Sequence, residues 1–390
     1  MIEYDVIVIG GGMVGQSFAL SLLQKSELKV AIIEPNNPQP KLTKDFHTRV
    51  SAINLKSEDL LTRLGVWELI KRKHVFTKTK VWDQNSHGSI SFNSQDESLS
   101  SLGSIIENDA IQKALYESLS RTSAEYIKAK LSSIKKINNG YQIRLDNDEN
   151  ITCQLLIGAD GALSRTRELA GIEFSTTNYN QQAIICNITT TNDFEDTTWQ
   201  RFLSDSIVAV LPLSNTQASI VWSANNHLAE DLISLSNEDF VKRLENATEH
   251  RFGRLKVASD IYSFPLIERS AKDYVKENLA LVGDAAHNIH PLAGQGVNLG
   301  FADVEELTHQ IINSNKPLGD YSVLRKYARS RRFDNELMAK TMTALNWIYK
   351  ENNEPLRWLR GLGMNIIDNN SSIKSFFQRQ ALGDTDKTPT

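Results

Sequence analysis

Two different periods of apolar positions govern the first 35 residues. Residues 4–9 form a short run rich in β-branched side chains, residues 14–25 carry apolar side chains at helical spacing, and residues 29–33 form a second apolar run. Three consecutive glycines at positions 10–12 separate the first run from the helical segment. The pattern predicts a strand, a turn, a helix and a second buried strand. Such a unit implies parallel strands and an α/β layer.

The same reading extends along the chain and predicts further elements. Amphipathic helices are expected at residues 57–64 and 109–119, and strands at 81–92, 141–145 and 151–157. From about residue 178 to 264 the pattern of apolar positions predicts short strands, at 183–188, 207–211 and 218–222, with one helix at 237–245. That stretch favours an antiparallel sheet. A buried strand at 279–282 and helices at 296–312 and 321–348 follow, so the two sheet types interleave along the chain.

The first glycine turn fits the dinucleotide-binding pattern G-x-G-x-x-G through Gly10, Gly12 and Gly15. Gly10 allows the tight turn, Gly12 lets the backbone approach a diphosphate, and Gly15 lets the helix pack closely on the strand. The diphosphate would meet free N–H groups at the start of the helix, at Met13 and Val14. Glu34 lies 19 residues beyond Gly15 at the end of the second strand, where a carboxylate would bind a ribose hydroxyl. The acid favours FAD or NAD over NADP.

Two later turns also follow apolar strands. Residues 155–157 run into Gly158-Ala159-Asp160-Gly161, which by itself is equally typical of a routine strand–turn–helix. Residues 281–282 run into Gly283-Asp284, and a glycine-rich segment at 291–300 opens another helix. Asp284 can bind a polyhydroxyl chain, and Gly294 and Gly296 allow backbone N–H groups to approach a flat ring. His287 and His290 invite a metal or acid–base interpretation, but without further ligands at suitable spacing a structural role is favoured.

Composition limits the class of protein. Hydrophobic residues make up 40 % of the 390 residues and charged residues 23 %, as in soluble globular proteins. The formal net charge of −4 gives no reason to expect a nucleic-acid partner. Cys153 and Cys186 lie 33 residues apart, which excludes the redox pair of a disulfide reductase, and two cysteines cannot form a four-ligand zinc site. Since no spanning segment or basic leader is present in the sequence, a cytoplasmic enzyme is expected.

The three turns, in this order, resemble the FAD-dependent aromatic hydroxylases, the group A flavoprotein monooxygenases with the para-hydroxybenzoate hydroxylase fold. Within that family, residues 49–67, 81–92 and 283–300 resemble the ubiquinone-biosynthesis hydroxylases, in particular those of the bacterial 2-polyprenylphenol hydroxylase type. Residues 361–368 and 379–383 extend the resemblance to the C-terminal region. The halogenase motif W-x-W-x-I-P is absent from the sequence.

The resemblance implies an α/β fold of composite α+β type. A discontinuous Rossmann-like FAD-binding domain (residues 1–75, 100–177 and 270–330) would interleave with an antiparallel-sheet substrate domain (76–99 and 178–269), followed by a helical region at 331–390. FAD would be bound tightly but not covalently. Its contacts would be Gly10, Gly12, Met13, Val14, Gly15 and Glu34 for the ADP half; Arg49 and Asp160 near the phosphates; Gly283 and Asp284 for the ribityl chain; and Pro291, Gly294, Gln295, Gly296, Val297 and Asn298 beside the isoalloxazine.

The resemblance also implies a reaction. NAD(P)H would reduce FAD as a transient co-substrate, and O₂ would form a flavin C4a-hydroperoxide that hydroxylates the ring of a polyprenylphenol in ubiquinone biosynthesis. No catalytic side chain is identified. Six residues of the predicted antiparallel sheet are candidate walls of the substrate pocket, although a core position is favoured for them: Phe202, Leu211, Pro212, Trp222, Phe264 and Leu266.

A lipid substrate requires contact with a membrane surface or with other ubiquinone-biosynthesis proteins. Residues 345–349 and 358–359, with cations nearby, are a candidate amphipathic contact at the inner membrane face, although packing on the body of the protein is favoured. Two alternatives remain open: a hydroxylase of a small soluble phenol, and a flavoprotein subunit without turnover. Another flavoenzyme on the same fold, such as a polyprenyl reductase, is a further alternative.

Overall fold

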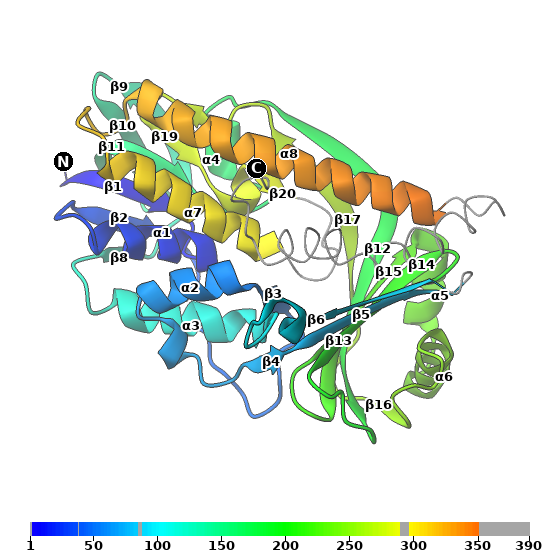
Figure 1. Cartoon of the computed structure of the whole chain (residues 1–390). Helices are drawn as coiled ribbons and strands as arrows, with labels where there is room; N and C mark the ends of the chain where they lie inside the picture. The colour runs from blue at the N-terminus through cyan, green and yellow to red at the C-terminus, as the bar shows by residue number, and fades with distance from the viewer. Residues whose placement is uncertain (1, 38, 85–87, 289–295, 351–390) are drawn as a thin grey trace, which may run out of the picture.

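A computed structural model describes residues 2–37, 39–84, 88–288 and 296–350. Figure 1 shows two lobes, one built on a sheet covered by helices and the other on a broad twisted sheet. The helices are α1 (Met13–Leu23), α2 (Leu55–Arg63), α3 (Asn108–Leu119), α4 (Arg165–Leu169), α5 (Asn226–Ser234), α6 (Asn237–Ala247), α7 (Gly296–Ile312) and α8 (Tyr321–Lys350), with short 3₁₀ turns η1 (Trp67–Leu69), η2 (Ser94–Glu97) and η3 (Gly283–Ala285).

The first lobe contains a sheet in the order β18-β19-β11-β1-β2-β8, with β9 and β10 added beside β11. Its strands are β1 (Ile2–Ile9), β2 (Val30–Ile33), β8 (Glu125–Ile127), β9 (Leu131–Ile137), β10 (Gly140–Leu145), β11 (Asn150–Gly158), β18 (Val275–Lys276) and β19 (Leu279–Leu281). The pairs β1–β2, β1–β11, β11–β19 and β2–β8 are parallel. Their carboxyl ends therefore lie at one edge, where doubly wound sheets bind ligands.

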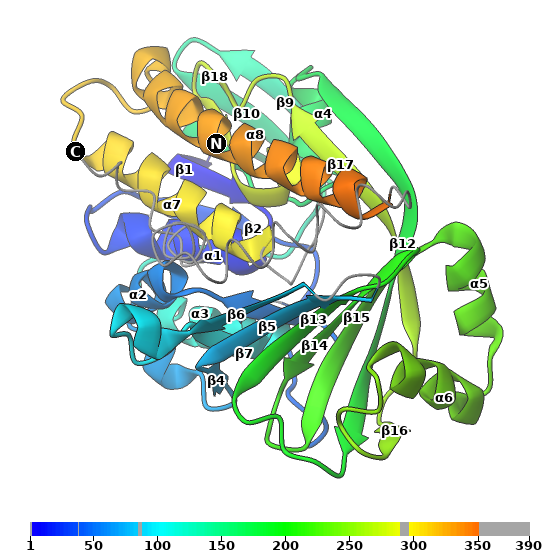
Figure 2. The ribbon, with the colours of Figure 1, turned by 45° about the vertical axis from the view of Figure 1, so that its right-hand side comes forward.

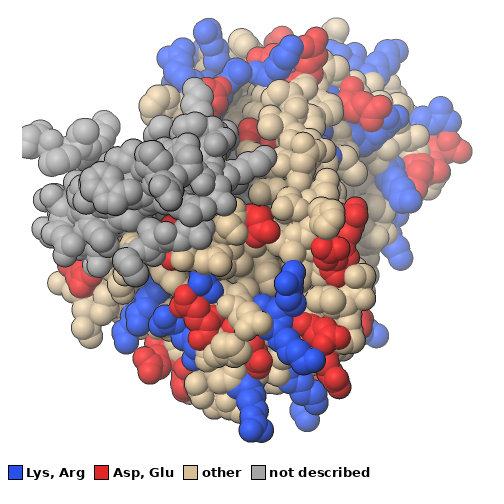
Figure 3. Space-filling model, turned by 90° about the vertical axis from the view of Figure 1, so that its right-hand side faces the viewer, with Lys and Arg blue, Asp and Glu red and all other residues tan. Residues whose placement is uncertain are grey.

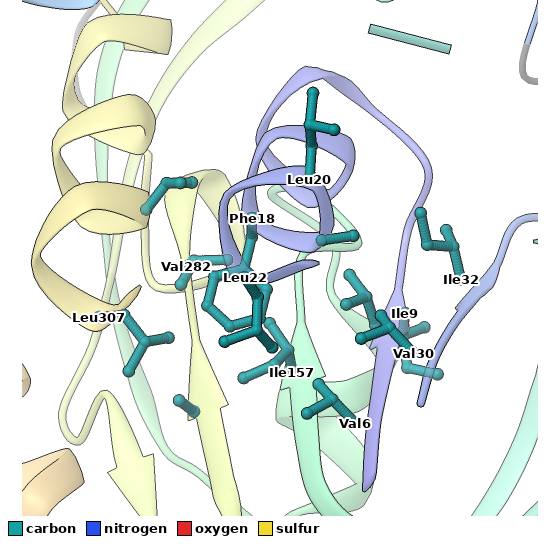
Figure 4. Packing of buried hydrophobic residues seen from close by; sticks show 14 of the residues in the cluster. Val6, Ile9, Phe18, Leu20, Leu22, Val30, Ile32, Ile157, Val282 and Leu307 are labelled. Atoms are coloured by element: carbon teal, nitrogen blue, oxygen red, sulfur yellow. The ribbon is translucent and has the colours of Figure 1, made fainter. Parts of the chain in front are cut away.

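The apolar face of α1 explains how this lobe is held together. Phe18 and Leu22 are fully buried and point toward Ile157 and Val282 of the sheet in Figure 4. One continuous core cluster joins this helix with the strands and with Leu307 of α7. The helix is thus fixed on the sheet by buried apolar surface, which is the main favourable term in such packing.

The second lobe has a sheet in the order β20-β17-β12-β15-β14-β13-β5-β6, with β16 beside β12. Its strands are β5 (Lys78–Asp83), β6 (Ser89–Asn93), β12 (Phe174–Thr190), β13 (Thr197–Phe202), β14 (Ser206–Pro212), β15 (Gln217–Asn225), β16 (Leu255–Val257), β17 (Tyr262–Ala271) and β20 (His287–Asn288). Helices α5 and α6 cover the outer face of this sheet (Figure 2). The long strand β12 has a register shift between Asn178 and Gln182, where Asn180 takes a φ of 53°.

A small third sheet, β3 (Val50–Ile53), β7 (Gly103–Glu107) and β4 (His74–Phe76), lies between the two larger ones. Leu211 of β14 and Phe76 of β4 share a core cluster there, so the inner face of the second sheet packs toward the first lobe. On the side shown in Figure 3, cationic and anionic side chains are mixed across the described surface. None of the described helices combines the length and the apolar character that a membrane span needs.

The predicted α/β fold is confirmed, and the helix predicted at 296–312 has the ends of α7. The single strand predicted at 81–92 is wrong: the segment is divided between β5 and β6, which pair antiparallel with each other. The polar stretch from Asp83 to Gly88, which contains Asn, Ser and Gly, interrupts the strand pattern as turn residues do. Helix α5 and strand β13 were not predicted.

Candidate functional site

Three turns meet at the carboxyl ends of β1, β11 and β19. A Cβ atom added to Gly10 would lie 2.3 Å from the carbonyl oxygen of Ala159, which places the first turn against the second. A Cβ added to Gly283 would lie 3.2 Å from the side chain of Val14 at the start of α1, and one added to Gly300 only 2.5 Å from it. Segments far apart in the sequence therefore converge on the amino terminus of one helix.

The three glycines of the first turn have different environments, and each fits the role expected of it. Gly10 has a φ of +106°, which favours glycine. A Cβ on Gly15 would lie 2.0 Å from the carbonyl oxygen of Gly10, so helix and turn touch directly. A Cβ on Gly12 would meet no described atom within 4 Å, and no side chain caps α1 there. Among the described residues, nothing therefore covers the start of the helix at Gly12, and its first N–H groups are available to an anion.

Glu34 lies beside this turn and is held in place by backbone donors. Its Oε2 accepts a hydrogen bond from the N–H of Gly11 at 2.8 Å, and its Oε1 accepts from the N–H and side-chain amide of Asn36 at 2.9 and 3.0 Å. Gln16 donates from Nε2 to the carbonyl oxygen of Gly11 at 2.6 Å. Gln16 was not among the predicted site residues, although a glutamine within the apolar positions of a helix is a recognisable signal for a buried polar contact.

The carboxylate of Asp160 binds within its own turn. It accepts hydrogen bonds from the hydroxyl of Ser164 at 2.5 Å and from the N–H and hydroxyl of Thr166 at 2.8 and 2.9 Å. These contacts organise the start of α4. A contact between Asp160 and a cofactor stays a prediction. Arg167, which was not predicted as a site residue, is buried and donates to the carbonyl oxygens of Ala285 at 2.8 Å and Ala162 at 2.9 Å, so it connects the second turn to the third.

Asp284 follows Gly283 in the third turn. Its side chain is exposed at one side, and the protein atoms packed around the rest of the carboxyl partly exclude water and raise its pKa above the ordinary value. Asn288 donates a hydrogen bond to it at 3.3 Å. An accessible carboxylate of this kind is suited to binding the hydroxyl groups of a ligand. Its neighbour His287 is buried and bonded to Asp303 at 2.6 Å, which agrees with a structural role.

The start of α7 is joined to the small central sheet. Asn298 donates from its side-chain amide to the carbonyl oxygen of Ala52 at 2.8 Å and accepts from the N–H of Asn54 at 3.3 Å. Both polar ends of Asn298 are thus used by the protein, while Gly296 and Val297 open the helix. The other predicted contacts of this loop, Pro291, Gly294 and Gln295, and also His290, lie outside the described residues.

Arg49 precedes β3 at the junction of the two lobes. Its side chain is exposed, and the guanidinium lies over the ring of Phe264 at 5.0 Å. The N–H of Asn108 donates to the carbonyl oxygen of Arg49 at 3.0 Å and fixes its backbone. Its predicted contact with the cofactor phosphates stays a prediction.

Of the six candidate pocket walls, Phe264 is half-buried and the others are buried. Trp222 belongs to the outer core and packs against Phe240 of α6 with 6.1 Å between ring centroids, which favours its core role.

The thiols of Cys153 and Cys186 are also buried, and this burial raises the pKa of each to about 12. They are inert thiols at neutral pH.

FAD is the group that the fold implies, and the residues present fit it. No described atom occupies the side of Gly12 where a diphosphate would lie, the carboxylate of Glu34 is held at the end of the second strand, and the exposed Asp284 follows Gly283, which packs against the start of the same helix. Tyr126 packs against Gly11, and its buried hydroxyl has no hydrogen-bond partner among the described residues. No signal in the sequence marked Tyr126, because its place depends on the pairing of β8 with β2.

Comparison with known proteins agrees with this geometry. Residues 3–341 match the family described as FAD binding domain, and the chain belongs to it. It is an FAD-dependent aromatic hydroxylase, as its relatives' names and its cofactor domain indicate. The 3-demethoxyubiquinol 3-hydroxylase of Escherichia coli (strain K12) is 34 % identical over 97 % of this chain and 98 % of the relative. The mitochondrial ubiquinone biosynthesis monooxygenase COQ6 of Rattus norvegicus is 32 % identical over 95 % and 89 %.

Among solved structures, p-nitrophenol 4-monooxygenase PnpA from Pseudomonas putida DLL-E4 aligns over 100 % of both chains with a TM-score of 0.77 and 17 % identity. That likeness concerns the fold. The family match and the relatives confirm the predicted family and the predicted cofactor.

Proposed function

We propose that this hydroxylase acts on the aromatic ring of a polyprenylphenol intermediate of ubiquinone biosynthesis, with NAD(P)H and O₂ as co-substrates. The observation that carries the cofactor assignment is the meeting of three turns at the open amino terminus of α1. The substrate class rests on relatives named for ubiquinone biosynthesis that align with nearly the whole chain. The ring position, and hence the 2-polyprenylphenol type, stays a prediction.

Bound FAD would supply the redox chemistry, because it can be reduced by NAD(P)H and can then activate O₂. The chain's own residues bind and orient it. The N–H groups at Met13 and Val14 would hold the diphosphate, Glu34 would accept a hydrogen bond from the adenosine ribose, and Asp284 would accept from the ribityl hydroxyls. These proposed contacts are hydrogen bonds, so the cofactor would be held without a covalent link.

The inner face of the second sheet is suited to cover the substrate ring. On β14 and β15 the outer positions carry Val210 and Trp222, which pack under the helices. The alternate positions carry Ala209 and Leu211 on β14 and Val221 and Ser223 on β15. Because side chains alternate between the faces of a strand, these residues lie on the inner face, where the small side chains of Ala209 and Ser223 stand beside larger apolar ones.

We propose the domain division given above, since strands of the first sheet lie within residues 2–33, 125–158 and 275–281. The proposed peripheral contact with a membrane or with other biosynthetic proteins involves residues 345–349 and 358–359, and no side chain of these segments is described. Loss of liposome flotation after changing Trp358 and Leu359 to Ala would support the contact. Flotation equal to that of the wild type would contradict it.

Two measurements test the function. Deletion of the gene under air should cause a polyprenylated quinone precursor to accumulate, detected by mass spectrometry, and wild-type protein should restore the pathway while a Gly12→Val variant does not. The purified holoenzyme should couple NAD(P)H oxidation to hydroxylation of a prenylated phenol. Coupling only to a short-chain phenol would favour a soluble-phenol hydroxylase. Restoration of the pathway by a variant without NAD(P)H oxidation would favour a non-catalytic subunit.

A further inference from the structure

Asp303 of α7 is a fully buried carboxylate with three partners. Its Oδ2 accepts hydrogen bonds from the N–H of Gly283 at 2.9 Å and from Nε2 of His287 at 2.6 Å. Its Oδ1 accepts from Nε of Arg331 at 2.8 Å. Asp303 is 0 % exposed, so it cannot touch a bound ligand itself. A carboxylate removed from water in this way is tolerated only when it is paired and hydrogen-bonded.

One oxygen of Asp303 holds the third turn of the cofactor site at two points. Gly283 has a φ of +58°, a left-handed conformation, and its N–H is directed at this oxygen. His287, which comes shortly after η3 in the chain, is hydrogen-bonded to the same oxygen. Asp284 lies between these two anchors. The direction of the Asp284 carboxyl therefore depends on a residue that is 19 positions further along the chain.

The other oxygen of Asp303 connects the turn to α8. Arg331 is buried, and its remaining nitrogens donate to Asp334 at 2.8 Å and to Asn335 at 3.1 Å. Burial alone would raise the pKa of Asp303, but His287 and Arg331 hold that pKa below its ordinary value. Asp303 is thus an ionised acceptor, and Nε2 of His287 carries the proton. Tyr327 of α8 also donates to the carbonyl oxygen of Leu281 at 2.7 Å, directly before the turn.

We propose that Asp303 and Arg331 are positioning residues for FAD, which act through the Gly283 N–H to set the direction of Asp284. The inference rests on the proposed contact between Asp284 and the ribityl chain. Through Arg331, the proposal adds α8 to the elements that position the cofactor. It also divides the site in two, because the ADP half depends on the first turn and the ribityl half depends on the Asp303 contacts.

Asp303→Asn tests this division in the full-length protein. An amide in place of the carboxylate can keep an acceptor toward Gly283 only by turning its NH₂ group toward Nε of Arg331, where two donors face each other. We expect calorimetric titration of the apoprotein to show FAD binding weakened about tenfold, the equivalent of one charge-assisted hydrogen bond. ADP should bind to the variant with unchanged affinity, because none of its proposed contacts lies in the third turn. Equal loss of ADP and FAD binding would show a general structural defect and overturn the proposal.

Two further variants sharpen the test. In an Asp284→Ala background, Asp303→Asn should cause no additional loss of FAD affinity, since its effect passes through Asp284. Additive losses would contradict the proposal. Asp334→Asn is the matched control, because it removes the negative charge of a partner of Arg331 and leaves all contacts of Asp303 in place. Its FAD affinity should equal that of the wild type.

Arg331→Lys covers the case in which Asp303→Asn does not fold. A lysine keeps the charge but cannot reproduce the planar fork of hydrogen bonds, so the same selective loss of FAD over ADP is expected. Unchanged FAD affinity in Arg331→Lys, or a loss shared with ADP, would overturn the role of the pair. If Asp284→Ala alone left FAD affinity unchanged, the proposed cofactor contact would be wrong, which is a different failure.

Discussion

A substitution at Gly12 is expected to impair cofactor binding while leaving the folding of the protein intact. The backbone of Gly12 is extended, with φ −74° and ψ −176°, which a valine adopts without strain. A Cβ at this position meets no described atom within 4 Å. Gly12→Val should therefore leave the apoprotein folded, with a change in stability of at most about 1 kcal/mol from the altered helix cap.

The cost should appear in FAD binding. A side chain at Gly12 occupies the space through which a diphosphate approaches the first N–H groups of α1. Each charge-assisted hydrogen bond to such an anion contributes about 1.5–3 kcal/mol. Loss of two of them would weaken FAD binding by about 3–6 kcal/mol, or about 10²- to 10⁴-fold in Kd.

Gly15→Ala is the matched control. Its Cβ would lie 2.0 Å from the carbonyl oxygen of Gly10, so helix and turn must move apart. Overpacking of this kind costs about 1–3 kcal/mol, and we expect the melting midpoint of the apoprotein to fall. The assay is thermal unfolding of each apoprotein followed by titration with FAD, monitored by flavin fluorescence. A Gly12→Val protein that purifies yellow with a normal flavin spectrum would refute the reasoning, and so would an unfolded one.

Three other predictions follow from the described side chains. Asp284→Ala should weaken FAD binding by one or two charge-assisted hydrogen bonds, about 1.5–3 kcal/mol each, and unchanged fluorescence titrations would mean that the third turn is misassigned. Burial lowers the pKa of His74 below 6.5 in the folded protein. The free energy of unfolding therefore has its full contribution from neutral His74 above about pH 6.5. This contribution is lost as the pH falls through the pKa of the folded state. His74→Gln should thus lose less unfolding free energy than the wild type between about pH 7.5 and 5.5 in urea titrations, and identical losses would contradict this. Because burial raises the pKa of Cys153 and Cys186 to about 12, a thiol reagent at about pH 8 should label both only after unfolding, and rapid labelling of the native protein would be inconsistent with their burial.

The sequence was informative where the backbone itself carries the function. Gly10, Gly12 and Gly15 were assigned different roles from their spacing, and the structure gives each a different environment that fits its role. Glu34 could be placed because the end of a parallel strand next to the first fixes its position. These are local relations, which a pattern of residues can express.

Contacts between distant helices were not predictable in the same way. Asp303 looked like an ordinary polar residue in α7, yet it is 0 % exposed and joined to Arg331, 28 residues further on in α8. Helical periodicity marks a face as buried but does not name the partner across it. Strand β13 was missed because its polar sequence, TTWQRF, shows little alternation. It is nonetheless mostly buried, since it pairs with β14 on one side and β5 on the other.

The interleaving of the two lobes has a consequence for the reaction. Strand β17 belongs to the second sheet, and its residues Arg269 and Ser270 pair with β20, directly after the turn that carries Asp284. His287 of β20 is at the same time bonded to Asp303. The surface proposed to cover the substrate and the turn proposed to hold the cofactor are therefore connected through one hydrogen-bonded strand pair. A hydroxylase must keep ring and flavin in fixed register, and a continuous sheet provides that register more directly than a flexible linker between two separate domains would.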